Sequence, residues 1–396
     1  MTTRIYYTEP WRREFESTVT SVEMREGRVV VFLDRTAFYP ASGGQPCDTG
    51  TLGDVTVLEV IDEEDRGVAH VVQGTLSPGQ QVRAAIDWAR RFDHMQQHTG
   101  QHILSAAFDH LFDARTESFH LGGDSSTIDL GREVTAAQIA DAEREACRVV
   151  WEDVPVSIRF VSEEEAARLP LRKEPARGGP LRLIEVEGFD LSACGGTHVS
   201  RTGEVGIVAV RGWERFRGGT RVEFVCGGRA LRAFHALRDV VAGSIRHLSV
   251  HPSELPDTIG RLQADLKEQR KVMRDQTMRL ADYQAVDMAA HAETVGNLRA
   301  VIAAPQGYDA AGIKSLSAAI VKQQSTVAVL FTATAPMQVV AARSADLAQP
   351  DCAALLRTLF ERFGGKGGGK PDLAQGGGLT APVAELIAAA RASIAG

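Results

Sequence analysis

Two short motifs in this chain combine residue types that bind transition metals. They are His98-Thr-Gly-Gln-His102 and Cys194-Gly-Gly-Thr-His198. The two His of the first motif are four positions apart in an apolar-periodic stretch from about Trp88 to Phe112, so a helix would place both rings on one face. The two glycines of the second motif allow a tight turn that brings its Cys and His to one point. Three imidazoles and one thiolate are a ligand set for a single Zn²⁺ ion.

The elements that must position these side chains are predicted from hydrophobic periodicity. Residues 1–86 contain short alternating runs separated by Gly, Asp and Pro turns, which predicts a small N-terminal β-barrel. Residues 87–237 mix helices and strands and carry both metal motifs, which predicts an α+β zinc-binding domain. The fold class is therefore α+β multidomain. The expected barrel strands lie at 21–33, 55–61, 68–72 and 82–86.

Capping signals place two further helices in the α+β domain. Thr135-Ala-Ala-Gln138 and Ser162-Glu-Glu-Glu165 both match the capping box that begins a helix. The strands of this domain are expected at 181–186, 205–211 and 221–225.

Residues 238–298 are polar and helical in pattern, and they form a predicted helical arm. A coiled coil needs two apolar positions in every seven residues, and at the second of these positions the arm has the polar residues Gln269 and Gln276. The pattern is therefore that of a weak coiled coil. A homodimer contact and an intramolecular hairpin explain it equally well. An apolar residue recurs every seventh position along the arm: Ile259, Leu266, Met273 and Leu280.

Residues 299–396 form a predicted C-terminal α/β domain that contains a run of glycines at 364–378. Gly364 to Lys370 matches the phosphate-binding pattern G-x-x-x-x-G-K, but the next residue is Pro371 instead of Ser or Thr. Without that hydroxyl a magnesium ligand is missing, so nucleotide hydrolysis is not expected. A flexible loop with two lysines remains. It suits a phosphate backbone, and a plain linker is the alternative.

Composition excludes several classes of protein. The chain has 396 residues, 44% hydrophobic and 24% charged, which is enough for two or three folded domains. It has no long apolar run and a charged N-terminus, which predicts a soluble cytoplasmic protein. Five cysteines at irregular spacing argue against a disulfide framework.

Positive charge concentrates in the segment 201–232 although the net charge is −7. Seven Arg face three Glu in this segment, a local excess of four positive charges beside the second metal motif. Such a band can steer a phosphodiester chain into the site. The alternative is an Arg-rich strand surface that binds no partner.

The order of motifs resembles one family over nearly the whole chain. Thr36-Ala-Phe-Tyr-Pro-Ala-Ser-Gly-Gly-Gln45, the two metal motifs and the glycine-rich block resemble the stand-alone alanyl-tRNA editing proteins called AlaX, in their long form. That form is similar to the editing and C-terminal parts of alanyl-tRNA synthetase, and the last hundred residues resemble its DHHA1-type tRNA-binding domain.

The resemblance implies an activity and a site. It implies that His98, His102, Cys194 and His198 are the zinc ligands. It also implies that the enzyme hydrolyses tRNA(Ala) wrongly charged with serine, with glycine as a second candidate substrate. Rejecting alanine needs a polar group that bonds the serine hydroxyl. Thr36 is the first candidate and Gln45 is a nearby orienting amide. Both also read as ordinary strand or loop residues.

Competing functions come from other classes. A zinc peptidase of the H-E-x-x-H type needs Glu where Thr99 stands. An alanyl-tRNA synthetase needs an additional aminoacylation domain, and a DHH-type phosphoesterase needs an Asp-His-His motif that the sequence lacks. The serious alternative is a non-catalytic tRNA-binding protein with a structural zinc.

Four further residues have weaker signals. His94 lies one turn before His98, and a surface or outer-sphere role is more plausible than a third ligand from the helix. His120 is either a proton shuttle or a satisfied buried histidine. Cys147 and Cys226 lie in apolar surroundings and are expected in the core.

Overall fold

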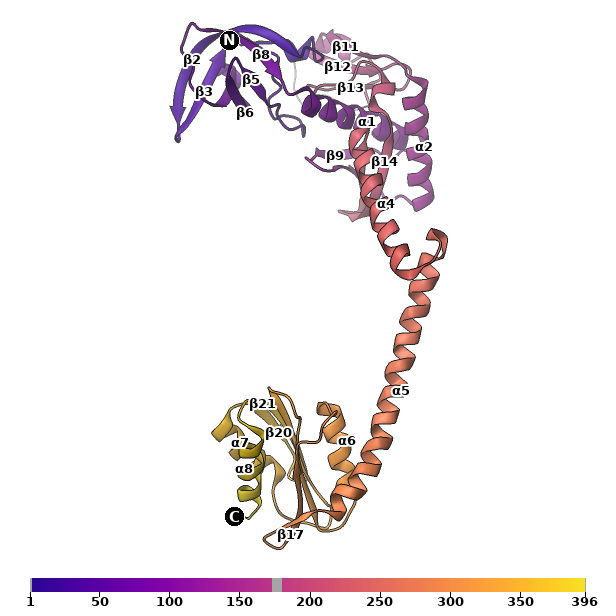
Figure 1. Cartoon of the computed structure of the whole chain (residues 1–396). Helices are drawn as coiled ribbons and strands as arrows, with labels where there is room; N and C mark the ends of the chain where they lie inside the picture. Colours follow the sequence, from indigo (N-terminus) through magenta and orange to yellow (C-terminus); the bar gives the residue numbers. More distant parts are fainter. Residues whose placement is uncertain (1, 173–179, 396) are drawn as a thin grey trace. The chain divides into compact units, whose positions relative to one another are not determined.

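A computed structural model describes residues 2–172 and 180–395 of the chain (Figure 1). It divides into two compact units, residues 1–243 and 244–396. No helix in the described ranges is long and apolar enough to cross a membrane.

The first unit begins with a closed barrel, as predicted. β2 (Glu14–Arg25) and β3 (Arg28–Leu33) form a hairpin, and their turn residues Glu26 and Gly27 both have positive φ, as a tight primed turn requires. Its interior is a cluster of buried apolar side chains that includes Val31, Leu52 and Val57. The strand order is β2-β3-β7-β6-β5-β8, with β5 (Gly50–Leu52), β6 (Val55–Asp62), β7 (Val68–Gln73) and β8 (Gln81–Ile86).

The α+β part of the first unit packs two helices against a four-stranded sheet. α1 (Trp88–Phe112) begins at Asp87, whose side chain accepts a hydrogen bond from the Arg90 N–H. α2 (Ala136–Glu152) has the complete capping box of Thr135 and Gln138. The sheet order is β14-β15-β10-β9, with β14 (Val208–Phe216), β15 (Gly219–Cys226), β10 (Ser126–Leu130) and β9 (Thr116–Leu121).

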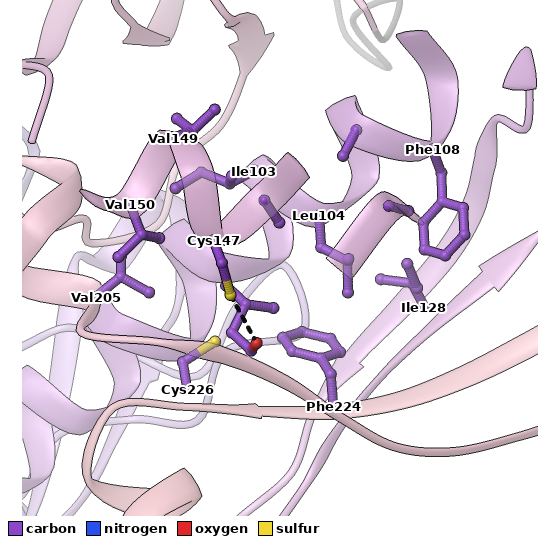
Figure 2. Packing of buried hydrophobic residues seen from close by; sticks show 14 of the residues in the cluster. Ile103, Leu104, Phe108, Ile128, Cys147, Val149, Val150, Val205, Phe224 and Cys226 are labelled. Atoms are coloured by element: carbon purple, nitrogen blue, oxygen red, sulfur yellow. Dashed lines mark hydrogen bonds between the residues drawn. The ribbon is translucent and has the colours of Figure 1, made fainter. Parts of the chain in front are cut away.

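Figure 2 shows the core between these layers, where side chains of α1, α2 and β15 interdigitate. A second, three-stranded sheet has the order β11 (Val156–Val161), β12 (Leu181–Val186) and β13 (Asp190–Ala193). Cys147 and Cys226 are buried in the core between α1, α2 and the four-stranded sheet, as predicted. The Cys147 thiol donates to the Val208 carbonyl at 3.2 Å.

Two local predictions in this unit have different outcomes. The helix expected to begin at Ser162 is confirmed, because the Ser162 hydroxyl caps it by accepting from the Glu165 N–H, although α3 (Glu163–Ala166) is only a single turn. The strand expected from residue 205 starts at Val208, because a 3-10 turn and Gly206 at φ 80° precede it. Residues 228–248 form the helix α4 (Gly228–Leu248), which extends well past the expected domain boundary at 237.

The second unit is an α/β layer structure, as predicted for residues 299–396. Along β18, Val327, Val329 and Phe331 face a cluster with α7 and α8, whereas Ala328 and Leu330 face α6 and the end of α5. The sheet is thus covered on both faces. Its order is β16 (Glu293–Val295), β17 (Leu298–Ala303), β18 (Thr326–Phe331), β19 (Met337–Arg343), β21 (Leu373–Leu379) and β20 (Lys366–Gly369); the helices are α6 (Ala310–Ile320), α7 (Cys352–Phe363) and α8 (Val383–Ala395).

The predicted arm is a long helix, α5 (Leu255–Ala290) (Figure 1). Its C-terminal end packs on α6 through Ala281 and Ala285. The residues after Ala290 turn into β16 instead of continuing the helix. The apolar seam is exposed, with Leu266 49% and Met273 68% accessible in the single chain. Pairing of this seam in a coiled coil stays a prediction.

The glycine run was wrongly predicted as a flexible loop. It is the antiparallel hairpin β20–β21, with Lys366 opposite Gly377 and Gly369 opposite Ala374. The strands pass close to the α7 side chain of Phe360, and a Cβ atom added to Gly376 would lie 2.4 Å from the Phe360 Cζ. Glycine is needed here because the ring of a neighbouring helix occupies the space of a side chain.

Candidate metal centre

α1 positions the first two candidate ligands. His98 and His102 lie one turn apart on this helix, and both are almost completely buried, with 1% and 4% exposure. Gly100 between them allows close packing, because a Cβ atom there would lie 2.2 Å from the Cys226 sulfur. The two imidazoles therefore point into the protein, as the sequence spacing predicted.

The loop after β13 brings in the other two ligands. The Cys194 N–H donates to the Arg182 carbonyl at 3.1 Å, which ties the start of the loop to β12. Gly196 then passes over the ring of His98 so closely that a Cβ atom would lie 2.1 Å from the His98 Cε1. Only glycine fits this approach, which lets the loop carry both Cys194 and His198 to the face of α1.

The four candidate ligands meet at one point. One donor atom from each of His98, His102, Cys194 and His198 lies within 4.8 Å of all the others. The Cys194 sulfur is 3.4 Å from the Nε2 atoms of both His98 and His198. Burial alone would raise the pKa of the Cys194 thiol, but these imidazoles lower that pKa well below its usual range. A thiolate among imidazoles is the donor set of a metal site.

Each imidazole is fixed from behind through its Nδ1 atom. The acceptors are the Gln45 Oε1 for His98 at 2.8 Å, the Asp190 Oδ2 for His102 at 2.9 Å and the Thr99 Oγ1 for His198 at 3.1 Å. An Nδ1–H that donates to these oxygens leaves Nε2 unprotonated and available to a metal. The residues therefore fit a metal ion in both donor type and tautomer.

Asp190 is the most heavily bonded of these partners. Its carboxylate also accepts from the Arg172 Nε at 2.6 Å and from the Ser192 hydroxyl. Burial alone would lower the pKa of His102, but the bond to Asp190 raises it to about 9. A metal at this ring displaces a proton, so binding there releases one.

Sequence reasoning missed Asp190, Thr99 and Arg172. Thr99 lies inside the first motif and Asp190 lies four residues before Cys194, so proximity in sequence to a ligand was the available signal.

The structure places the two candidate pocket residues differently. Gln45 joins the cluster: it accepts from the His98 Nδ1 and the Thr197 N–H, and its amide donates to the Thr197 hydroxyl at 2.8 Å. Thr36, in the short strand β4 (Arg35–Thr36), is fully buried and contacts His70 and the Phe38 N–H instead of the four ligands.

Replacing Gln45 with Leu is expected to weaken metal binding by about 10–100-fold, because His98 would lose the acceptor that fixes its tautomer. Competition with a metal chelator, followed by metal content, measures the change. Gln45→Glu keeps an acceptor oxygen for His98 and is the matched control, with an expected loss smaller than that of the Leu variant. Equal metal affinity in Gln45→Leu and the unmodified protein would contradict a positioning role for Gln45.

The two other histidines also differ from expectation. His94 is buried, with 2% exposure, so a surface role is wrong. Burial and Arg90 lower its pKa to about 4, and it is not part of the four-residue cluster. His120 lies in β9 and is exposed, so the buried alternative is wrong for it.

Most of the positive charge in segment 201–232 is already paired. Arg217, at the turn between β14 and β15, is exposed and has no carboxylate within ion-pair distance among the residues that the structure describes. The free charge of this segment is therefore smaller than its composition suggests. The ion pairs are Arg201 with Asp153, Arg211 with Glu223, Arg215 with Glu133, Arg221 with Asp129, and Arg229 and Arg232 with Asp93.

Comparison with known families matches three parts of the chain. The profile described as tRNA synthetases class II (A) matches residues 9–90, and the Threonyl and Alanyl tRNA synthetase second additional domain matches residues 181–223. The DHHA1 domain matches residues 297–396. The second match contains the loop with Cys194 and His198.

Two similar proteins cover almost the whole chain, and a third covers more than half of it. Alanyl-tRNA editing protein AlaX-L of Pyrococcus horikoshii is 30% identical over 95% of this chain and 94% of its own length. An alanine–tRNA ligase of Methanothrix thermoacetophila is 33% identical over 95% of this chain, which spans only 42% of that ligase. The mouse alanyl-tRNA editing protein Aarsd1 is 36% identical over 57% of this chain and 58% of its own. The chain belongs to the AlaX-L family of alanyl-tRNA editing proteins.

Proposed function

We propose that this protein is a zinc-dependent deacylase that hydrolyses the ester of Ser-tRNA(Ala) in trans and spares Ala-tRNA(Ala), with Gly-tRNA(Ala) as a second candidate substrate. Membership of the family already makes it an aminoacyl-tRNA editing hydrolase. The observation that supports the finer proposal is the buried convergence of His98, His102, Cys194 and His198.

The donor set supports zinc as the metal. Imidazole and thiolate suit Zn²⁺, and His98, His102, Cys194 and His198 would hold it. When bound, zinc supplies positive charge that stabilises the oxyanion developing at the ester carbonyl. Gln45, Asp190 and Thr99 keep the three rings oriented for this, so we assign Gln45 a positioning role.

Thr36 is our proposed specificity residue. A buried hydroxyl that bonds the serine side chain is left with an unmatched polar atom when alanine is bound, which is how a site separates two amino acids of similar size. The fully buried position of Thr36 would make such a mismatch costly.

tRNA is the proposed partner. We propose that it lies along the segment 201–232 and the glycine and lysine hairpin at 364–378, where Lys366 and Lys370 are exposed. The division of labour would be a barrel domain at 1–86, a zinc-binding editing domain at 87–237, a helical arm at 238–298 and a DHHA1-type tRNA-binding domain at 299–396. The exposed seam of the arm supports a homodimer, and we place the protein in the cytoplasm.

Arg217→Glu is expected to weaken tRNA binding and to reduce the salt dependence of the binding constant by roughly one to two charges. The reason is that Arg217 is exposed and has no carboxylate partner in the described part of the chain. Filter binding of tRNA(Ala) at several salt concentrations measures the slope. Arg144→Glu, on the exposed face of α2 with its own partner Asp141, is the charge-matched control. An unchanged slope for Arg217→Glu would show that the β14–β15 hairpin does not contact the tRNA.

Release of labelled serine from Ser-tRNA(Ala), with Ala-tRNA(Ala) as control, tests the proposed function directly. Purified protein should release serine quickly and leave alanine attached, and His98→Ala should abolish the release. Tight tRNA binding without release above the spontaneous rate would instead favour a tRNA-binding protein with a structural zinc.

A further inference from the structure

His70 is a fully buried polar residue that the metal centre does not use. It lies in β7 of the barrel with 0% exposure, and its ring makes an edge contact with Phe38 at 5.6 Å between centroids. Its Nδ1 is 3.2 Å from the Val31 carbonyl oxygen and its Nε2 is 2.9 Å from the Thr36 hydroxyl. Both ring nitrogens therefore have a defined partner.

The partners decide which nitrogen of His70 carries the proton. A carbonyl oxygen can only accept, so Nδ1–H donates to Val31. Burial lowers the pKa of His70 to about 4, although hydrogen bonds to the backbone of Val31 and Val68 oppose the shift, so the ring is neutral at physiological pH. A neutral ring with its proton on Nδ1 has a bare Nε2, which accepts.

The same count of hydrogen-bond donors and acceptors fixes the direction of the Thr36 hydroxyl. Its O–H must donate to the bare Nε2 of His70, and its oxygen already accepts from the Phe38 N–H at 3.1 Å. A hydroxyl has one donor and two acceptor lone pairs. One lone pair is left, so Thr36 can offer a further group an acceptor and no donor.

We infer that His70 is a positioning residue that holds Thr36 as a hydrogen-bond acceptor, so that the site selects aminoacyl groups whose side chain donates a hydrogen bond. This inference rests on the proposed function, in which Thr36 reads the amino acid. It names serine, whose hydroxyl donates, as the preferred substrate. Glycine and alanine carry no side-chain donor and gain nothing from Thr36.

A pair of substitutions tests the inference. His70→Gln places an amide oxygen near the position of Nε2 and can still accept from Thr36, whereas His70→Leu cannot. We expect the Leu variant to lose at least about tenfold in kcat/KM for Ser-tRNA(Ala), and less than about threefold for Ala-tRNA(Ala) measured at high enzyme concentration. The Gln variant should recover most of the serine activity. Equal losses on both substrates in both variants, with normal metal content, would overturn the inference.

A second measurement does not depend on activity. Long-range ¹H–¹⁵N spectra of the full chain with labelled histidine, assigned by the missing signal of His70→Gln, report the tautomer of His70. We expect the neutral ring with Nδ1–H from pH 5 to 8. A proton on Nε2 in that range would overturn the inference even if the enzyme is active. The expected tautomer in a protein that releases no serine would instead show that the proposed function fails while the Thr36 geometry holds, and the inference about selection would fall with it.

Discussion

Cys194→Ser is expected to remove the bound metal and to lower the deacylation rate by at least about 100-fold. Cys194 supplies the only anionic donor of the four ligands, and the neighbouring imidazoles hold its pKa low, so the thiolate is the form that the site stabilises. Loss of an outer partner alone costs about 10–100-fold in metal affinity, and loss of a direct ligand costs more. A hydroxyl in its place stays protonated and binds zinc poorly.

Elemental analysis of the purified protein and serine release measure this effect together. Cys47→Ser is the matched control, since Cys47 is a partly buried free cysteine of the same unit that is not part of the cluster. It should retain full metal content and activity. A Cys194→Ser protein that keeps its metal but loses activity would mean that the thiolate acts on the substrate instead of holding the ion.

Arg91→Met is expected to destabilise the first unit by about 3–5 kcal/mol. The Arg91 guanidinium is completely buried and forms an ion pair with Asp48, whose side chain is also 0% exposed. It also donates to the Pro10 carbonyl at 2.7 Å and to the Ala37 carbonyl at 2.5 Å. Removing it leaves the buried Asp48 carboxylate without its counter-charge, with only the Tyr39 N–H at 2.6 Å still donating to it, and takes the donor away from two carbonyls. This is the costly way to break a buried pair.

Urea denaturation followed by tryptophan fluorescence isolates this unit, because all four Trp lie in residues 1–243. Arg90→Met is the control: Arg90 is half-buried and donates one bond, to the Cys47 carbonyl at 2.9 Å. It should cost about 1 kcal/mol or less. A midpoint for Arg91→Met equal to that of Arg90→Met would show that water satisfies the groups around Asp48.

The sequence predicted those elements whose signals are local. The ends of α1 matched because Asp87 caps the helix and the apolar period runs to Phe112. The barrel strands at 55–61, 68–72 and 82–86 matched, whereas the run at 21–33 is divided by the hairpin turn between β2 and β3, and the short strand β5 (Gly50–Leu52) was missed. By contrast, the glycine hairpin was predicted as a loop because its strands are specified by the ring of Phe360, a residue of α7 that pattern reasoning along the hairpin does not include.

The candidate site likewise contains residues that lie in local motifs and residues whose contacts depend on packing between distant segments. The structure brings the four predicted ligands together. They could be predicted because their motifs are compact and specific. The carboxylate behind His102 was missed, since proximity to Cys194 was the only signal for Asp190 and its distance from the ring depends on the packing of β13 against α1. The ion pairs that reduce the free charge of segment 201–232 were not predictable for a related reason, because partners such as Asp93 and Asp153 lie outside the segment.

The contacts behind the metal ligands span large separations in the chain, and this affects folding kinetics. Gln45 bonds Thr197 across 152 positions, and His98 meets Cys194 across 96. Contacts between such distant positions form slowly and late. During synthesis the metal centre cannot form until His198 has left the ribosome, by which time the barrel strands have long been available. The rate of metal uptake by refolding protein should therefore follow the final step in folding of the first unit.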